Sequence, residues 1–245
     1  VVTLVPHHWP ESNEVLQRNR RTGLGLTGVL QKELSTIEEW CDATYPQLER
    51  EDEEFSERLT EVLGYKVNPS IKLTTIKPSG TASLLSGASP GAHPDFSEYY
   101  IRRIRIASSS PIVEACRKAG YHVEHVLRFD GSRDPGTCVV EFPVKAKEGT
   151  TLAKDMTAID QLEVVKTLQR CWSDNAVSVT IYYRKEELDD IKSWLEENYN
   201  KHIKAVSFLQ HSEHGFAQAP LEEIDSKEYE RRIRTIKPLD LSSSH

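Results

Sequence analysis

The sequence predicts an α/β fold in which mostly parallel strands are joined by helical crossovers. Apolar residues with the two-residue period of a strand alternate along the chain with apolar residues at helical spacing. Glycine or proline stands at most boundaries between these segments. Because parallel strands need a long connection, usually a helix, this alternation favours a parallel sheet. The 245 residues, 38% of them hydrophobic, are enough for one sizeable core, and we expect one domain.

Two helices are expected before Gly64. Residues 35–63 carry apolar side chains at helical spacing, and Pro46 interrupts them. Because proline removes a backbone donor inside a helix, we expect the first helix to end near it. The acidic run Glu49–Glu54 is expected to face water, since unpaired carboxylates repel one another and no His or Cys stands beside them to complete a metal site.

Alternating or β-branched apolar residues mark the expected strands. Ile71, Leu73 and Ile76 define the first strand, and Pro78 ends it by removing a ladder donor. In the second strand, isoleucines alternate imperfectly with arginines, and AVSVTIYY at 176–183 is the clearest strand in the chain. The expected strands are 71–76, 100–107, 137–144, 176–183 and 203–210.

Capping and stop residues mark the later helices. Gly120 ends the helix that starts at Pro111, because glycine readily adopts the left-handed conformation that closes a helix. Thr157, with Asp160 three residues on, forms a variant of the capping box that opens a helix. The expected helices are one from about Thr81, and then 111–120, 158–172 and 186–199.

Composition argues against several classes of partner. The net charge of −7 and the pI near 5.8 disfavour a nucleic acid or a membrane surface, which need a basic face, so any phosphate site must be local. No apolar run approaches 18 residues and no signal-peptide layout opens the chain, so we expect neither a membrane span nor export. The four cysteines lack metal-ligand spacing and are expected to be buried, reduced thiols of a cytoplasmic protein.

The segment 71–94, IKLTTIKPSGTASLLSGASPGAHP, is the most informative in the chain. It has the pattern of a strand, a turn of small residues and the start of a helix. Backbone N–H groups of that helix, together with the hydroxyls of Ser79, Thr81 and Ser83, form an array of donors that suits a phosphate. The alternative is that Ser79 or Thr81 only caps the helix, as serine and threonine commonly do.

Six long runs carry a family resemblance. They are NRRTGLGLTGV (19–29), TIKPSGTASLLSGASPGAHP (75–94), YIRRIRIASSS (100–110), DMTAIDQL (155–162), WSDNAVSVTIYYRKEE (172–187) and AVSFLQHSEHGFAQAP (205–220). In their order along the chain and in their residues, they resemble the adenosylcobalamin-dependent, or class II, ribonucleoside-triphosphate reductases, over nearly the whole chain. Runs of this length are far more specific than a lone glycine-rich loop.

The resemblance implies a fold, a reaction and a site. The fold is the ten-stranded α/β barrel of ribonucleotide reductases, with residues 1–238 as the C-terminal portion of the catalytic barrel and 239–245 as a polar tail. The reaction is the reduction of ribonucleoside triphosphates to deoxyribonucleotides by a thiyl radical that starts from adenosylcobalamin. Nucleotide effectors and a thioredoxin-like reductant are the implied partners. The residues expected to hold the substrate phosphates are Ser79, Gly80, Thr81, Ala82 and Ser83.

No catalytic residue and no metal ligand is expected within the chain. The family's radical cysteine lies in an Asn-x-Cys-x-Glu loop, and none of the four cysteines has that context. The redox cysteine pair of the family's tail is also missing, since no cysteine follows Cys171. We therefore expect the chain, which begins with Val1, to be a piece of a longer polypeptide with the radical cysteine upstream, and the isolated piece to be inactive.

Other polar residues are expected to serve structure. His211 and His214 follow a strand, but a third metal ligand is lacking, so packing is favoured over a metal site. The arginines of 100–107 could neutralise a phosphate, and ion pairs with the acidic helices are favoured. His7, His8 and Asn175 are expected to be surface or turn residues.

Two alternatives to a cobalamin-dependent reductase stay open. The chain could be a non-catalytic nucleotide-binding remnant or interaction module that keeps the phosphate loop without the thiols. It could also belong to a reductase barrel with another radical source, either a di-iron partner subunit or a glycyl radical. Saturable binding of a ribonucleoside triphosphate without reduction would indicate the module.

Overall fold

The computed structural model describes residues 2–80, 83, 86–211 and 217–240. The chain separates into two compact units. Unit 1 comprises residues 1–94, 149–151 and 155–211, and unit 2 comprises residues 95–148, 152–154 and 212–245. The division into a barrel portion at 1–238 and a tail at 239–245 stays a prediction.

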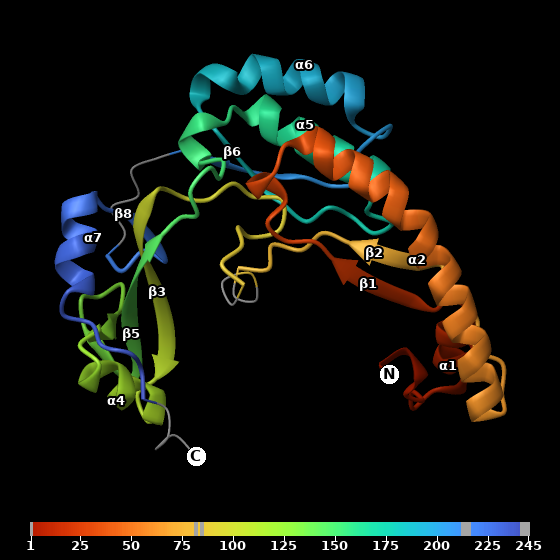
Figure 1. Cartoon of the computed structure of the whole chain (residues 1–245), viewed down its shortest axis with the longest axis horizontal. Helices are drawn as coiled ribbons and strands as arrows, with labels where there is room; N and C mark the ends of the chain where they lie inside the picture. Colours follow the sequence, from red (N-terminus) through yellow and green to blue (C-terminus); the bar gives the residue numbers. More distant parts are fainter. Residues whose placement is uncertain (1, 81–82, 84–85, 212–216, 241–245) are drawn as a thin grey trace. The chain divides into compact units, whose positions relative to one another are not determined.

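Unit 1 is built on parallel strands, as the sequence predicts. Its strands are β1 (Arg21–Gly25), β2 (Lys72–Thr75), β6 (Thr180–Tyr183) and β7 (Ser207–Gln210). β1 pairs in parallel with β2, and β6 pairs in parallel with β7. A parallel bridge between Ile76 and Val177 joins β2 to the segment that leads into β6. Because β1 and β2 are parallel, their carboxyl ends lie at the same edge (Figure 1).

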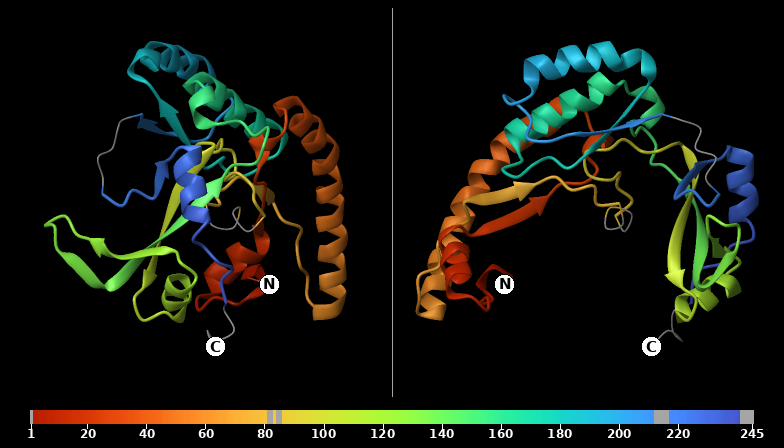
Figure 2. Two further views of the ribbon diagram at one scale, coloured as in Figure 1. Left: turned by 60° about the vertical axis from the view of Figure 1, so that its left-hand side comes forward. Right: turned by 180° about the vertical axis from the view of Figure 1, so that it is seen from behind.

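Helices pack on the strands of unit 1. They are α1 (Pro10–Arg18), α2 (Leu34–Leu63), α5 (Ala158–Cys171) and α6 (Leu188–Asn198), with short 3-10 turns at Val2–Leu4, Val29–Gln31 and Lys185–Glu187. Figure 2 shows α2, α5 and α6 on one side of the strands. Leu162 and Leu168 of α5 are fully buried in one core with Ile76 and Ile181. Thr157 opens α5 with both hydrogen bonds of the predicted capping box.

α2 is one continuous helix across Pro46, so the expected break is wrong. A proline inside a helix costs about 3 kcal/mol, but the apolar residues before and after Pro46 belong to one stripe. Ile37, Cys41 and Leu48 all join the core of unit 1, and a break would detach part of that stripe. Gly64 ends α2 in the left-handed conformation (φ 71°), as predicted.

Unit 2 is an antiparallel sheet, so the expectation of mostly parallel pairing is wrong for this part of the chain. In sheet order its strands are β4 (His122–Leu127), β5 (Arg133–Lys145), β3 (Tyr99–Ala107) and β8 (Leu221–Glu223), and its helices are α4 (Pro111–Lys118) and α7 (Ser226–Ile233). The sequence does not predict β4, because the three apolar residues of HVEHVL do not alternate with the two-residue period of a strand. Strand partners depend on contacts between distant segments, which a local pattern does not encode.

Within the described residues, no helix combines the length and the apolar character needed to cross a bilayer.

Candidate functional site

The expected phosphate loop begins where β2 ends. Ser79 has a left-handed backbone (φ 39°), which is strained for a residue with a side chain. Ser83 is helical, and both its N–H (3.0 Å) and its hydroxyl (2.7 Å) donate to the Ser79 carbonyl. Gly80 lies in the turn, whereas Thr81 and Ala82 fall outside the described residues. The Ser83 hydroxyl is thus engaged inside the turn. The Ser79 hydroxyl is the better candidate for contact with a ligand.

A second segment of the chain holds Ser79. Its hydroxyl lies 2.9 Å from the hydroxyl of Thr27, which follows β1. The backbone N–H of Gly91 donates to both hydroxyls, at 3.2 Å to Ser79 and 3.1 Å to Thr27. Thr27 itself donates to the carbonyl of Ser89 (2.8 Å). The turn after β1 and the loop after β2 are therefore one hydrogen-bonded unit.

The same unit contains a tightly packed glycine and an unsatisfied serine. Gly91 has a φ of +55°, and a Cβ there would lie 2.1 Å from the carbonyl oxygen of Lys77. Gly28, also left-handed, donates its N–H to the carbonyl of Ser89. Ser89 is fully buried, and its hydroxyl has no hydrogen-bond partner among the described residues. Such buried, unpartnered hydroxyls are unusual in folded proteins.

His93 links the end of the loop segment to β6. Its Nδ1 lies 3.0 Å from the carbonyl oxygen of Pro90, and its Nε2 accepts the N–H of Thr180 (3.2 Å). These two contacts require the tautomer that carries the proton on Nδ1. Burial lowers the pKa of His93, so the ring is an uncharged structural link.

A short segment before β6 holds β2, a feature that sequence reasoning missed. Asp174 accepts the backbone N–H of Leu73 (2.8 Å) and the hydroxyl of Tyr45 (2.7 Å). Asn175 donates its side-chain amide to the carbonyl of Thr74 (2.7 Å). Burial opposes the charge on Asp174, but hydrogen bonds from Leu73, Tyr45 and Thr74 outweigh it and hold its pKa below the ordinary value. We call Asp174 and Asn175 the β2 clamp.

The histidine pair after β7 is described only in part. His211 is exposed, and its ring packs on Tyr182 with 5.5 Å between the centroids. Residues 212–216, which include His214, lie outside the described residues. His7 and His8 are exposed, as predicted.

In unit 2, Arg103 of β3 forms ion pairs, as the sequence favours, but with glutamates of strands rather than with acidic helices. The Arg103 guanidinium lies 2.7 Å from Glu141 and 2.5 Å from Glu222. Arg232 of α7 contacts the other oxygen of Glu141. Burial opposes the charge on Glu141, but the two arginines outweigh it and hold its pKa below the ordinary value.

His122, Glu124 and Glu141 offer possible metal-ligand atoms that lie within 4.8 Å of one another. Glu141 is already neutralised by its two arginines, and Glu124 accepts hydrogen bonds from Arg133 (3.1 Å) and Gln218 (2.8 Å). A cation would have to displace these partners. The group is therefore best described as part of an ion-pair network.

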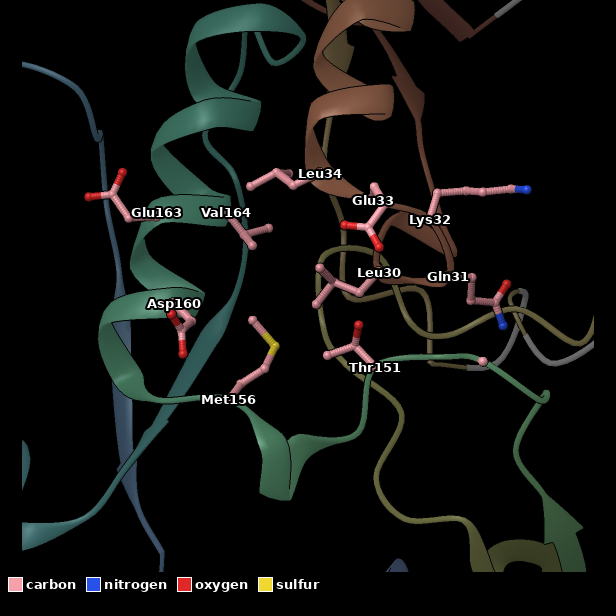
Figure 3. A pocket seen from close by; sticks show the side chains of 11 residues that line it. Leu30, Gln31, Lys32, Glu33, Leu34, Thr151, Met156, Asp160, Glu163 and Val164 are labelled. Atoms are coloured by element: carbon pink, nitrogen blue, oxygen red, sulfur yellow. The ribbon is translucent and has the colours of Figure 1, made fainter.

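A pocket of about 500 Å³ opens in unit 1 between the starts of α2 and α5 (Figure 3). Two of its three carboxylates have structural partners: Asp160 caps α5, and Glu163 accepts the indole N–H of Trp194 (2.6 Å). None of the three expected site residues that the structure describes, Ser79, Gly80 and Ser83, lines it. The lining residues are Leu30, Gln31, Lys32, Glu33, Leu34, Gly149, Thr151, Met156, Asp160, Glu163 and Val164.

All four cysteines are buried, free thiols, as predicted. A hydrogen bond with Cys171 and burial raise the pKa of Cys41, and burial raises the pKa of Cys116. A raised pKa keeps these two thiols protonated and weakly nucleophilic.

The sequence profile described as "Ribonucleotide reductase, barrel domain" matches residues 30–209. The chain belongs to the ribonucleotide reductase barrel family. An adenosylcobalamin-dependent ribonucleoside-triphosphate reductase of Euglena gracilis is 39% identical over 250 residues, which cover 100% of this chain and 33% of that protein. A probable enzyme of the same name from Dictyostelium discoideum is 40% identical, covering 98% of this chain and 31% of that protein.

A solved structure supports the same placement among ribonucleotide reductases. The crystal structure of a B-12 dependent (class II) ribonucleotide reductase has a TM-score of 0.78 and 31% identity, and covers 96% of this chain and 36% of that one. The resemblance to class II reductases and the α/β barrel class are therefore confirmed. The chain spans about a third of the length of the curated relatives that it matches.

Proposed function

We propose that this chain is part of an adenosylcobalamin-dependent ribonucleoside-triphosphate reductase, in which the turn after β2 holds the substrate phosphates through Ser79–Ser83. Family membership and relatives named for that activity support the proposal. The observation that carries the loop's role is the Ser79 hydroxyl, which a strained backbone and Thr27 hold beyond the carboxyl end of β2. Ligands of open α/β sheets bind beyond the carboxyl ends of parallel strands.

The loop's task in this proposal is to place the ribose. A cysteine thiyl radical takes the 3′ hydrogen of the ribose, the 2′ hydroxyl leaves as water, a cysteine pair supplies two reducing equivalents and becomes a disulfide, and the 3′ hydrogen then returns to the ribose, which regenerates the thiyl radical. Anchored phosphates keep the ribose within reach of the radical, and orientation of this kind supplies about 7 kcal/mol or more of barrier reduction in well-oriented systems. None of the four cysteines of this chain is assigned to these steps.

Adenosylcobalamin is the proposed radical source because the relatives are named for their dependence on it. When bound, it supplies a carbon-centred radical by homolysis of its cobalt–carbon bond. His93, the first histidine after the loop, has both ring nitrogens engaged by Pro90 and Thr180, so we do not assign it as a cobalt ligand. We derive no step through the cofactor and assign substrate positioning to this chain.

The proposed partners are nucleotide effectors and a thioredoxin-like reductant, and the proposed location is the cytoplasm. Four free thiols suit a reducing compartment. The net charge of −7 disfavours a nucleic acid as partner, so the phosphate contacts are assigned to local hydroxyl and N–H groups.

Ser79→Asp and Thr81→Asp test the loop in the reductase produced from its complete reading frame. Each substitution places a carboxylate against the substrate phosphates, and like charges in contact cost several kcal/mol, so we expect kcat/KM to fall about 100-fold or more. Steady-state reduction of a ribonucleoside triphosphate measures it. Ser35→Asp, an exposed serine in the first turn of α2, is the matched control and should retain activity.

Two outcomes would contradict the proposal. Unchanged KM and kcat in both loop variants would remove the loop from the site. Saturable nucleotide binding by the wild-type protein without any reduction, in the presence of adenosylcobalamin and a dithiol, would favour a binding module.

A further inference from the structure

We propose that Thr27 is a positioning residue of the substrate site: it holds the Ser79 hydroxyl in place by accepting a hydrogen bond from it, until a phosphate oxygen replaces Thr27 as the acceptor. This inference rests on the proposed function, because it takes the loop after β2 to be the phosphate site. It adds the turn after β1, a segment 52 residues away along the chain from Ser79, to that site.

The direction of the hydrogen bonds follows from counting protons. Thr27 has one hydroxyl proton, and the carbonyl of Ser89 at 2.8 Å takes it. The Gly91 N–H donates to both hydroxyl oxygens. In the 2.9 Å contact between the two hydroxyls, Ser79 must therefore be the donor and Thr27 the acceptor. The Ser79 hydroxyl proton is therefore the proton of this group that can turn from its present acceptor, Thr27, to an acceptor on a ligand.

The oxygens of this group are fixed in position. Gly91 cannot shift easily, because it packs against the Lys77 carbonyl with no room for a Cβ. Thr27 is tied to Ser89, whose carbonyl also accepts the N–H of Gly28. The Ser79 backbone is strained at φ 39°, and strain of this kind persists only where surrounding contacts impose it.

The site is also accessible to a ligand. Thr27 is exposed and Ser79 is half-buried, so a phosphate can approach the pair from solvent. A phosphate oxygen is a stronger acceptor than a neutral hydroxyl, because hydrogen bonds to charged groups are stronger. Rotation of the Ser79 hydroxyl then redirects its O–H from the Thr27 oxygen to the phosphate oxygen, while the hydrogen bond from Gly91 keeps the Ser79 oxygen in place.

A double-mutant cycle in the complete reductase separates positioning from mere stabilisation. Thr27→Val removes the hydroxyl and keeps the shape, so we expect KM for a ribonucleoside triphosphate to rise about tenfold, with kcat within about twofold. Thr27→Ser keeps the hydroxyl and should restore KM. In a Ser79→Ala background, Thr27→Val should raise KM no further, because it acts through Ser79.

Thr22→Val is the matched control. Thr22 lies on β1, and its hydroxyl bonds the carbonyls of Lys72 and Leu73 at 3.3 Å each, away from the loop. It should lower the unfolding midpoint about as much as Thr27→Val does and leave KM unchanged. If the Thr27→Val protein does not fold, Thr27→Ala replaces it in the double-mutant cycle with Ser79→Ala.

The outcomes distinguish the inference from the proposed function. If Ser79→Ala leaves KM unchanged, the loop is not the phosphate site and the proposed function fails. If Ser79→Ala raises KM but Thr27→Val does not, or if the two effects multiply fully in the double variant, Thr27 is not a positioning residue for Ser79 and this inference alone is overturned.

Discussion

Asp174 shows how one carboxylate fixes a strand from a distance of 101 residues along the chain. It accepts a backbone N–H of β2 and the Tyr45 hydroxyl of α2, and so joins a strand, a helix and the segment before β6. Removing it would leave these donors without their acceptor. Because β2 leads directly into the loop, this residue stabilises the unit that carries the candidate site.

Asp174→Asn is therefore expected to lower the free energy of unfolding by about 2–3 kcal/mol at pH 7, since the acceptor loses its charge and one of its two oxygens becomes an NH2 group that faces a donor. The folded state holds the pKa of Asp174 below its ordinary value. Its stabilising contribution is complete above the unfolded-state pKa and is lost as the pH falls through the folded-state pKa. Urea unfolding of both proteins at several pH values should show the difference shrinking below about pH 4.

Glu196→Gln, an exposed carboxylate of α6, serves as the control for charge removal and should differ little from wild type at any pH. A difference between wild type and Asp174→Asn that stays constant from pH 7 to pH 3 would show that the Asp174 charge does not contribute.

At the same scale, the sequence predicts the residues of the loop but not their partners. Ser79 is predicted because proline, glycine and hydroxyl residues follow a strand within a few positions. Thr27 and Asp174 act across 52 and about 100 residues, and a threonine or an aspartate in a turn is ordinary in itself. Contacts between residues this far apart form only in the folded protein, so the local sequence pattern does not predict them.

At the scale of elements, α2 continues through Pro46 at the expense of one hydrogen bond. Pro46→Ala restores a backbone N–H that can bond to Asp42, four residues earlier, so we expect a stabilisation of about 1–2 kcal/mol, part of the usual cost of an internal proline. Thermal unfolding should show a higher midpoint. Gln47→Ala, an exposed neighbour, is the control and should change stability by less than about 0.5 kcal/mol.

A lower midpoint for Pro46→Ala would show that the helix geometry imposed by the proline is needed for packing. In that case Ile37 and Leu48, which lie on either side of it, could not reach the core from a straight helix.

Element type was more predictable than element pairing. The two residues of the α5 capping box are three positions apart, and Gly120 lies just after the end of α4. Local sequence is therefore enough to predict both features. The antiparallel order of unit 2 depends instead on pairing of β3 with β5 and β8, whose partner residues lie 30 to 123 positions further along the chain. The clamp on β2 was missed for the same reason.

At the scale of the whole molecule, β1 pairs only with β2, and β7 pairs only with β6, among the described residues. Each therefore has one edge without a strand partner in this part of the chain. Unpaired strand edges are templates for pairing with another chain, and large apolar side chains such as Trp40 and Val62 are exposed as well. We expect the isolated 245-residue chain to oligomerise or aggregate. Sedimentation velocity over a 50-fold concentration range would show it, whereas a concentration-independent monomer with cooperative unfolding would contradict it.

The β2 clamp also sets an order of events during synthesis. β1 and β2 are complete once residue 75 has been added, but Asp174 and Asn175 are added about 100 residues later, which at 5–20 residues per second is about 5–20 s. During that interval β2 has neither its side-chain anchor nor its parallel neighbour before β6. β2 is thus made early but fully supported only late in synthesis, whereas the contacts of Ser79 with Thr27 and Gly91 can form once residue 91 has been added.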